Sequence, residues 1–140
     1  MRITTDTNIL ISGTFWTGDS FRILNLVNKN NIKLILSDEI LLEYNTTINK
    51  DEILDKIEDK GLIASKIVKT ALNNATIVEP NEKLDIVKDD PDDNKILECA
   101  IEGNVDYLIT NDNHLLRIKQ FRGIKIITPE EFLEIFKENN

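Results

Sequence analysis

DPDDNKILECAIEGNVDYLITND, residues 90–112, predicts a helix that leads directly into a short buried strand. Asp90 is a typical N-cap residue, and Pro91 suits the first position of a helix. Acidic residues in the first turn favour the positive end of the helix dipole. Gly103 is a typical residue to end the helix, and the apolar run Tyr107–Thr110 follows it as a strand. A helix that feeds a buried strand in this way is typical of α/β folds.

The rest of the chain repeats this alternation of short apolar runs and longer helical patterns. Five runs predict strands: Arg2–Thr5, Lys33–Leu36, Thr76–Glu79, Tyr107–Thr110 and Lys125–Ile127. Strands that alternate with helices predict a parallel sheet covered on both faces, and right-handed crossovers favour a doubly wound arrangement. We therefore predict an α/β fold and one domain that spans residues 1–140.

Several capping residues mark the expected helices in the first part of the chain. The apolar run Asn8–Ser12 is compatible with a helix, and Gly13 and Gly18 are expected to bracket the loop after it. Ser20 is a candidate cap for a helix that continues to about Asn30. Ser37 is a candidate cap for a helix after the second strand, since acidic residues follow it in the first turn.

Two more helical regions follow. Residues 51–60 and 62–74 predict two helices separated by Gly61, a favourable residue at a helix C-terminus. The sequence Thr128-Pro129-Glu130-Glu131 is a capping box that opens the last helix.

Composition narrows the class of protein. The chain has 140 residues with 41% hydrophobic and 30% charged residues, which indicates a globular domain. No apolar run approaches the length of a membrane span and no long apolar segment of a secretory signal is present at Met1–Asp6, so we expect no membrane association. The only cysteine, Cys99, fits the helix core and a reducing compartment, and we expect a cytoplasmic protein.

The ratio of basic to acidic residues indicates which kinds of partner the protein can bind. The 17 basic and 25 acidic residues give a formal net charge of −8. This balance argues against binding of nucleic acid by bulk charge alone. It is compatible with an enzyme whose carboxylates bind metal.

Four acidic residues fall at or near the carboxyl edge of the predicted sheet, where open parallel sheets bind ligands. Asp6 follows the first strand and Asp112 follows the fourth, while Asp93 and Glu43 lie in early turns of helices. Taken singly, each has an ordinary interpretation as a solvated loop residue, a cap or a helix-dipole acid. Glu43 is expected near the boundary of the buried face. Carboxylates that converge with few nearby cations usually bind a hard divalent cation.

The same residues carry a family resemblance. Asp6-Thr7-Asn8, Glu43, the run Asp90–Leu97 with Ala100, Thr110-Asn111-Asp112 and the tail Gly123–Leu133 together resemble PIN-domain proteins. The chain is most similar to the toxin components of toxin–antitoxin systems that are related to VapC. The resemblance implies a PIN-like three-layer α/β/α fold with a central, mostly parallel five-stranded sheet, and a metal-dependent ribonuclease site.

The resemblance also implies roles for individual residues. It implies that the catalytic and metal-binding residues are Asp6, Glu43, Asp93 and Asp112. Asn8 and Thr110 match polar positions that support these carboxylates, and Asp90 and Asp92 belong to the same acidic run as Asp93. Asn111 and His114 stand where many relatives carry Gly and Asp.

The activity implied is that of a Mg²⁺- or Mn²⁺-dependent endoribonuclease, with RNA as substrate, a cognate antitoxin as partner and a homodimer as the assembly. Within this scheme we expect Asp6 and Asp93 to anchor the principal ion and Asp112 to complete its site. Glu43 is expected to bind a second ion or to hold and deprotonate the attacking water.

Basic residues follow the last of these carboxylates. Arg117, Lys119, Arg122 and Lys125 lie between Asn113 and Pro129 with no acid among them, a local charge of +4. They either guide an RNA backbone toward the site or form a solvated face, and both interpretations stay open. His114 is interpreted as a surface or capping residue in preference to a general acid. Trp16 is interpreted as a packing residue in preference to a base-stacking one.

Two other functions are compatible with the sequence. A phosphohydrolase of the haloacid-dehalogenase type also carries an Asp after its first strand, but it needs a second Asp two residues later, where this chain has Asn8. A non-catalytic PIN module that binds RNA or protein is the other alternative.

Overall fold

The computed structural model describes residues 1–15, 18–29, 32–50, 55 and 63–138. Within these residues one sheet has the strand order β3-β2-β1-β4-β6-β5. Its strands are β1 (Arg2–Thr5), β2 (Lys33–Ser37), β3 (Thr76–Val78), β4 (Tyr107–Ile109), β5 (Gln120–Phe121) and β6 (Ile124–Ile127). All neighbours pair in parallel except β5, which pairs antiparallel with β6. The mostly parallel α/β fold is confirmed, with six strands instead of the five predicted.

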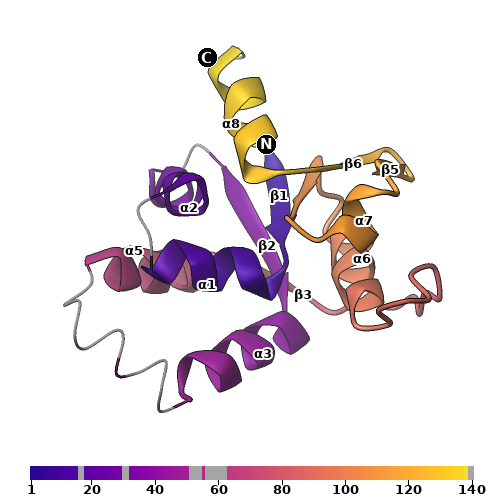
Figure 1. The fold of residues 1–140 in the computed structure, drawn as a ribbon, viewed down its shortest axis with the longest axis horizontal. Helices are drawn as coiled ribbons and strands as arrows, with labels where there is room; N and C mark the ends of the chain where they lie inside the picture. Colours follow the sequence, from indigo (N-terminus) through magenta and orange to yellow (C-terminus); the bar gives the residue numbers. More distant parts are fainter. Residues whose placement is uncertain (16–17, 30–31, 51–54, 56–62, 139–140) are drawn as a thin grey trace.

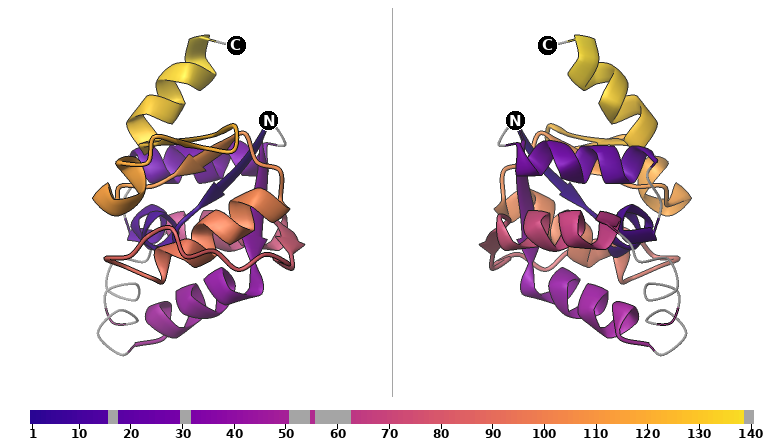
Figure 2. Two further views of the ribbon diagram at one scale, coloured as in Figure 1. Left: turned by 90° about the vertical axis from the view of Figure 1, so that its right-hand side faces the viewer. Right: turned by 90° about the vertical axis from the view of Figure 1, so that its left-hand side faces the viewer.

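Helices flank the sheet on both sides (Figure 1). The described helices are α1 (Thr7–Phe15), α2 (Asp19–Asn28), α3 (Asp38–Ile48), α5 (Ile63–Asn73), α6 (Asp93–Glu102), α7 (Asn113–Leu116) and α8 (Pro129–Glu138). Helices α1, α2 and α5 contact one another on one side, and α6 contacts β1, β2 and β4 from the other. Helix α8 extends away from the body of the domain (Figure 2). None of the described helices is long and apolar enough to cross a lipid bilayer.

The central strands are buried on both faces, as the layered arrangement requires. Leu34, Ile35 and Leu36 of β2 are consecutive and each is at most 1% exposed. Cys99 of α6 is also fully buried, which confirms its expected place in the core. Because both faces of the sheet are covered, its carboxyl edge is the natural place for a ligand.

Two predicted caps are present. The Ser37 hydroxyl accepts a hydrogen bond from the Ile40 N–H at the start of α3. At the start of α8, Thr128 Oγ1 accepts from the Glu131 N–H while Glu131 Oε1 accepts from the Thr128 N–H, which is the reciprocal pattern of a capping box.

Two expectations for the N-terminal helices are wrong. Gly13 lies inside α1 and does not begin a loop, because its missing side chain lets α2 approach: a Cβ there would lie 2.6 Å from Leu24 Cδ1. The N-cap of α2 is Gly18 and not Ser20, so Ser20 lies within the first turn. Helix α2 ends at Asn28, slightly before the expected end near Asn30.

The start of α6 also differs from the prediction. The helix begins at Asp93, with Asp92 as its N-cap, and Asp90 instead accepts the Asp93 N–H through its backbone carbonyl in the preceding turn. The helix ends before Gly103, as predicted. Two short elements, α7 and β5, were not predicted. The expected helix over residues 51–60, its break at Gly61 and the position of Trp16 lie outside the described residues.

Candidate metal centre

The carboxyl edge of the sheet has a switch point between β1 and β4. From β1 the chain continues through α1 and α2 to β2 on one side, whereas β4 pairs with the other side of β1. Ligands bind at such a point because the connections diverge there and leave a crevice. Thr5 pairs with Ile109, so the residues that follow, Asp6 and Thr110, lie next to each other at the edge.

Thr110 links two of the carboxylate residues. Its hydroxyl donates to Asp6 Oδ2 at 2.5 Å and accepts from the Asp112 N–H at 2.9 Å. Asp6 Oδ1 accepts the Ile9 N–H at the start of α1. Asp112 caps α7 by accepting the His114 N–H at 2.8 Å. The orientation of both carboxylates is therefore fixed by hydrogen bonds within the protein.

Helix α6 supplies the third carboxylate. Asp93, its first residue, is 7% exposed, and its Oδ2 has no hydrogen-bond partner among the described residues. A buried carboxylate oxygen without a donor is costly. Lys95 does not relieve it, since this lysine pairs at the rim with Asp92 at 3.6 Å and Glu39 at 3.7 Å.

These side chains line one pocket of about 130 Å³. Its acidic lining residues come from four parts of the chain: Asp6, Glu43, Asp90, Asp92, Asp93 and Asp112. Asn8 lies in the same lining with an exposed side chain. Segments far apart in the sequence thus contribute carboxylates to one small volume.

The electrostatic consequence is a raised pKa at two positions. Burial is the main cause that raises the pKa of Asp6, with Asp112 and Glu43 adding to the shift, against the opposing hydrogen bonds from Thr110 and Ile9. Burial and the neighbouring carboxyl of Asp112 raise the pKa of Asp93 to about 8, with further contributions from Asp90 and Asp6. The two shifts therefore come first from burial and second from the neighbouring carboxylates of the same pocket.

The sequence model of the PIN domain family matches residues 2–114, most of the chain. This chain belongs to the PIN domain family. Among solved structures, one chain of VapBC2 from Rickettsia felis, bound to a DNA fragment from their promoter, has the same fold with a TM-score of 0.60. The two share 18% identity over 91% of this chain and 98% of that one. No curated protein matches the sequence.

The acidic pocket of this PIN domain has the ligand atoms that a divalent cation needs. Asp90, Asp93, Asp112 and His114 each offer a ligand atom, and these atoms lie within 4.8 Å of one another. Carboxylate oxygens are ligands that suit both Mg²⁺ and Mn²⁺. The unpartnered Oδ2 of Asp93 is an oxygen that a cation would satisfy. Asp6, with both oxygens already hydrogen-bonded to protein, and Glu43 lie in the same pocket.

The four acidic residues singled out in the sequence therefore share one pocket, but not equally. Asp93 lines the same pocket as Asp6 and Asp112, as expected from its place near the edge of the sheet. Glu43 is exposed and directly precedes the buried Tyr44, so it lies at the boundary of the buried face. Asp92 is exposed and ion-paired with Lys95. Asp90 is half-buried and is one of the four residues whose ligand atoms lie within 4.8 Å of one another.

His114 is the residue that sequence reasoning undervalued. Its Nδ1 lies 3.5 Å from Asp112 Oδ1 and has no hydrogen-bond partner among the described residues. The two residues are brought together by the capping turn, in which Asp112 Oδ1 also accepts the His114 N–H. The chain's only histidine thus lies beside the acidic group, with its side chain 35% exposed.

A strap, defined as residues 81–87, holds Asp90 near α6. Asn94 Oδ1 accepts the N–H groups of Ile86 and Val87, and its amide nitrogen donates to the Val87 carbonyl. One turn on, Glu98 accepts the Leu84 N–H at 2.8 Å. These contacts explain why two polar residues are buried on α6.

The predicted RNA-binding cations are not equivalent. Arg122 makes a two-bond ion pair with Glu82 of the strap at 2.7 and 2.8 Å and lies over the Phe121 ring. Arg117 lines a second pocket together with His114 and Lys88. Lys119 and Lys125 line a third pocket, which also includes Glu131. Arg117 is therefore the one of the four that shares a pocket with a residue of the acidic group.

Proposed function

We propose that this PIN domain is a Mg²⁺- or Mn²⁺-dependent endoribonuclease that hydrolyses RNA phosphodiester bonds. The observation that supports this most strongly is the buried, unpartnered Oδ2 of Asp93 among three further potential ligands within 4.8 Å. This arrangement concentrates acidic groups in a small buried volume, which lowers the stability of the fold, and a bound cation would offset that cost. Membership of the PIN family supports a nuclease as the class of activity.

The cation would be held by Asp93 and Asp112, with Asp90 and His114 completing its surroundings. When bound, such a cation supplies Lewis-acid stabilisation of the phosphate and lowers the pKa of water. Asp6 contributes negative charge next to this group, and Thr110 fixes both Asp6 and the Asp112 backbone. Glu43, exposed on α3 at the rim of the pocket, is free to accept a proton from the attacking water.

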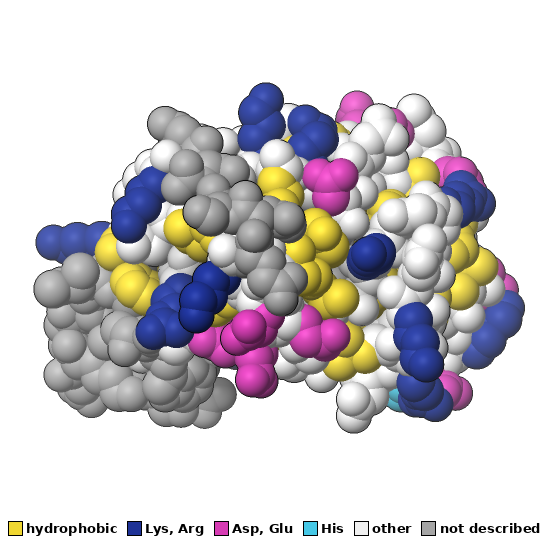
Figure 3. All heavy atoms as spheres, turned by 90° about the horizontal axis from the view of Figure 1, so that it is seen from above, with side chains coloured by type: hydrophobic (Ala, Val, Ile, Leu, Met, Phe, Trp, Pro, Cys, Tyr) yellow, Lys and Arg dark blue, Asp and Glu magenta, His cyan; other side chains and the backbone are white. Residues whose placement is uncertain are grey.

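RNA is the substrate class that we favour, and we expect only a few Lys and Arg side chains to contact its backbone. Figure 3 shows Lys and Arg side chains scattered over one face with Asp and Glu side chains among them, not gathered into a single-sign patch. With a net charge of −8, long-range attraction of RNA is excluded, so local contacts must position the backbone. Arg117 and Lys88, which line the pocket that includes His114, are the nearest candidates for phosphate contacts.

The biological role that we propose is the toxin of a toxin–antitoxin pair in the cytoplasm, with a cognate antitoxin as partner and a homodimer as its assembly. The support is the resemblance to VapC-related toxins and the shared fold with a chain of VapBC2. A single domain over residues 1–140 is part of the same proposal. Co-expression with the product of an adjacent reading frame, followed by pull-down and a growth assay, tests this role.

Cleavage of a single-stranded RNA tests the activity. We expect cleavage with Mg²⁺ or Mn²⁺, loss in EDTA and recovery when the metal is restored. Asp93→Asn should reduce the rate by at least about 100-fold, as expected when a charged group at a reacting phosphate is removed. Glu134→Gln is the control, since Glu134 is exposed on α8 and does not belong to the lining of the acidic pocket. Equal rates for the two variants would contradict the proposed site.

A further inference from the structure

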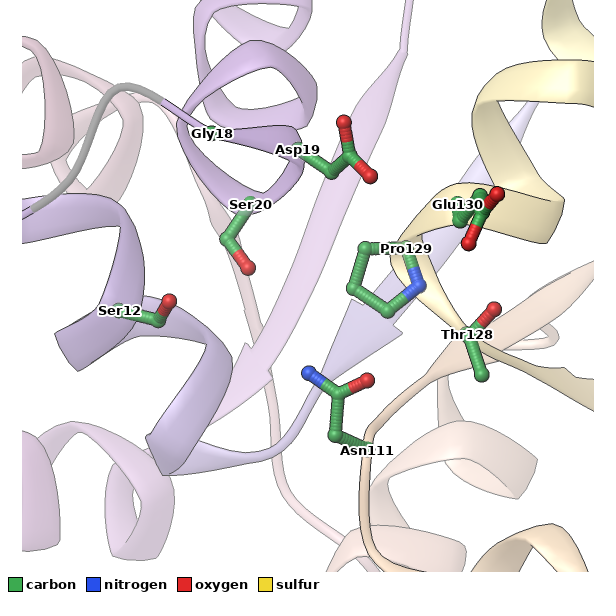
Figure 4. A pocket seen from close by; sticks show the side chains of 8 residues that line it. All are labelled: Ser12, Gly18, Asp19, Ser20, Asn111, Thr128, Pro129 and Glu130. Atoms are coloured by element: carbon green, nitrogen blue, oxygen red, sulfur yellow. The ribbon is translucent and has the colours of Figure 1, made fainter.

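A further pocket, of about 330 Å³, is lined in part by Asn111, the residue between Thr110 and Asp112 of the metal centre (Figure 4). Its polar lining comes from α1, from the first turns of α2 and α8 and from the loop after β4: Ser12, Asp19, Ser20, Asn111, Thr128 and Glu130. The ring of Pro129 adds an apolar wall. We call this the Asn111 pocket. Its volume is at the lower end of the range for small-molecule sites.

The Asn111 pocket contains hydrogen-bonding groups that the described protein does not use. The hydroxyls of Ser12 and Ser20 and the amide of Asn111 make no hydrogen bond to any described residue, although Ser20 is only 6% exposed. In Figure 4, Ser20 and Asn111 point into the space from opposite sides. Side chains that converge on one cavity with unused donors and acceptors are typical of a site for a polar ligand.

The Asn111 pocket is rigidly connected to the metal centre. Asn111 stands between Thr110 and Asp112, whose backbone and side chain are fixed by the hydrogen bonds of the site. Ser12 follows Asn8 of the acidic pocket by one turn of α1, about 6 Å along the helix. A ligand in the Asn111 pocket would therefore contact residues that neighbour, along the chain, those that line the acidic pocket.

The charges in the pocket exclude a phosphate group as its ligand. Two carboxylates, Asp19 and Glu130, belong to the lining, and no Lys or Arg does among the described residues. Asp19 is partly engaged by Arg22 at 3.7 Å, which leaves Glu130, exposed in the first turn of α8, as the freer acceptor. Carboxylates accept hydrogen bonds from the amino groups of bases, and Asn and Ser side chains can either donate hydrogen bonds to base edges or accept them.

We propose that the Asn111 pocket binds an unpaired RNA base that carries an exocyclic amino group, next to the phosphodiester held at the metal centre. Single-stranded RNA is read in this way, through splayed bases bound at their hydrogen-bonding edges. This inference rests on the proposed ribonuclease activity and deepens it, because it assigns base preference to Asn111 and Glu130.

Nucleoside binding tests the pocket without any cleavage. The metal-free wild-type chain is titrated with guanosine or inosine, which differ in the amino group alone, and with cytidine or uridine, where uridine has a carbonyl and an N–H in place of the amino group and the acceptor nitrogen beside it. At about 10 mM, above the roughly millimolar Kd expected for so small a contact, the side-chain amide resonances of Asn111 should shift with cytidine and guanosine. No shift, or equal shifts within each pair, would overturn the inference.

Cleavage of RNA provides the second measurement. Oligonucleotides in which a single guanine is replaced by hypoxanthine, or a single cytosine by uracil, should be cut at least about fivefold more slowly at one position next to the cleavage site. Glu130→Gln should reduce this discrimination, whereas Glu134→Gln, the same charge change one turn along α8, should retain it. If the wild type cleaves no RNA, the proposed function fails. If it cleaves and Glu130→Gln discriminates like the wild type, the pocket assignment fails alone.

Discussion

At the residue scale, Asp93 combines burial with a surrounding of like charges, two properties that lower the stability of a fold. Its pKa is raised to about 8 by burial and by Asp112, and its Oδ2 has no hydrogen-bond donor among the described residues. The sequence could predict that Asp93 follows a helix start, but not that it is buried. Burial depends on the strap and on α3, which contact α6 only in the folded chain.

We expect Asp93→Asn to stabilise the metal-free protein while it removes activity. The amide keeps the shape of the carboxyl and avoids the cost of burying an acid beside other carboxylates, so the free energy of unfolding should rise by about 1 kcal/mol. For a chain of this size the melting temperature should increase by about 4 °C. Thermal unfolding in EDTA and in Mg²⁺ measures both effects. The wild type should gain stability from Mg²⁺ and the variant should not, whereas a variant that melts lower in EDTA would contradict this account.

The raised pKa values also predict how stability changes with pH. Asp6 and Asp93 hold protons more tightly in the folded chain than in the unfolded chain, so the folded state binds more protons between their unfolded pKa near 3.8 and the higher folded values. The contribution of these groups to the free energy of unfolding therefore falls as pH rises from about 4 to about 8. Denaturant unfolding in EDTA across this window, with Asp93→Asn as the reference, isolates the contribution of Asp93. In the variant the decrease should be smaller, and an unchanged decrease would refute the assignment.

Thr110 should act through the carboxylates that it orients. Thr110→Val keeps the buried shape but removes the donor to Asp6 Oδ2 and the acceptor for the Asp112 N–H. The loss of partners for two buried groups should cost about 1–3 kcal/mol, and metal affinity should fall by about 10- to 100-fold. Thr110→Ser, which restores the hydroxyl, should recover the metal affinity. Mn²⁺ titration followed by calorimetry measures this, and equal affinities for the Val and Ser variants would exclude the positioning role.

At the scale of elements, local signals predict those starts and ends that local contacts determine. The caps at Ser37 and Thr128 and the stop at Gly103 depend on groups within a few residues, and each was predicted. Gly13 was misread because its role depends on Leu24 of another helix, and no local pattern reveals such a contact. The short β5 forms only by pairing with β6 after a turn at Arg122 and Gly123, both of which have positive φ.

The strap makes α6 a support for the metal centre as well as a core helix. Asn94→Ala removes three hydrogen bonds to the backbone of Ile86 and Val87, and we expect a loss of about 2–3 kcal/mol in the free energy of unfolding. Because Asp90 lies three residues after the end of the strap, Mg²⁺ affinity should also fall. Asn49→Ala, which removes one exposed hydrogen bond at the end of α3, is the control and should change neither quantity by a comparable amount. Denaturant unfolding and Mg²⁺ titration of the same samples test both parts, and normal Mg²⁺ affinity in a destabilised Asn94→Ala would separate the strap from the site.

At the scale of the whole molecule, the order of strands explains why the acidic residues meet. Asp6 and Asp112 follow neighbouring strands on either side of the switch point, so the expected edge could be derived from the alternation of strands and helices alone. The sequence could not show which four residues bring their ligand atoms within 4.8 Å of one another, because Asp90 and His114 are placed there by a turn and by a short helix. The Asn111 pocket could not be predicted either, because its lining comes from four parts of the chain that meet only in the folded protein.

The distribution of charge over the whole molecule predicts a weak dependence of RNA binding on salt. Arg122 is occupied by Glu82, so the candidates to neutralise phosphates are Lys88 and, of the predicted set, Arg117, Lys119 and Lys125. Each contact to a single strand contributes about −0.7 to the slope of log K against log salt, so with these four the slope should be no steeper than about −3. Fluorescence anisotropy with the non-cleaving Asp93→Asn variant, at one low Mg²⁺ concentration and increasing KCl, measures it. Arg117→Gln should make the slope shallower by about 0.7. Arg122→Gln should leave the slope unchanged and lower the melting temperature, because it releases the strap. A slope that becomes shallower in Arg122→Gln would mean that Arg122 binds RNA. Its ion pair with Glu82 would then be present only in the RNA-free protein.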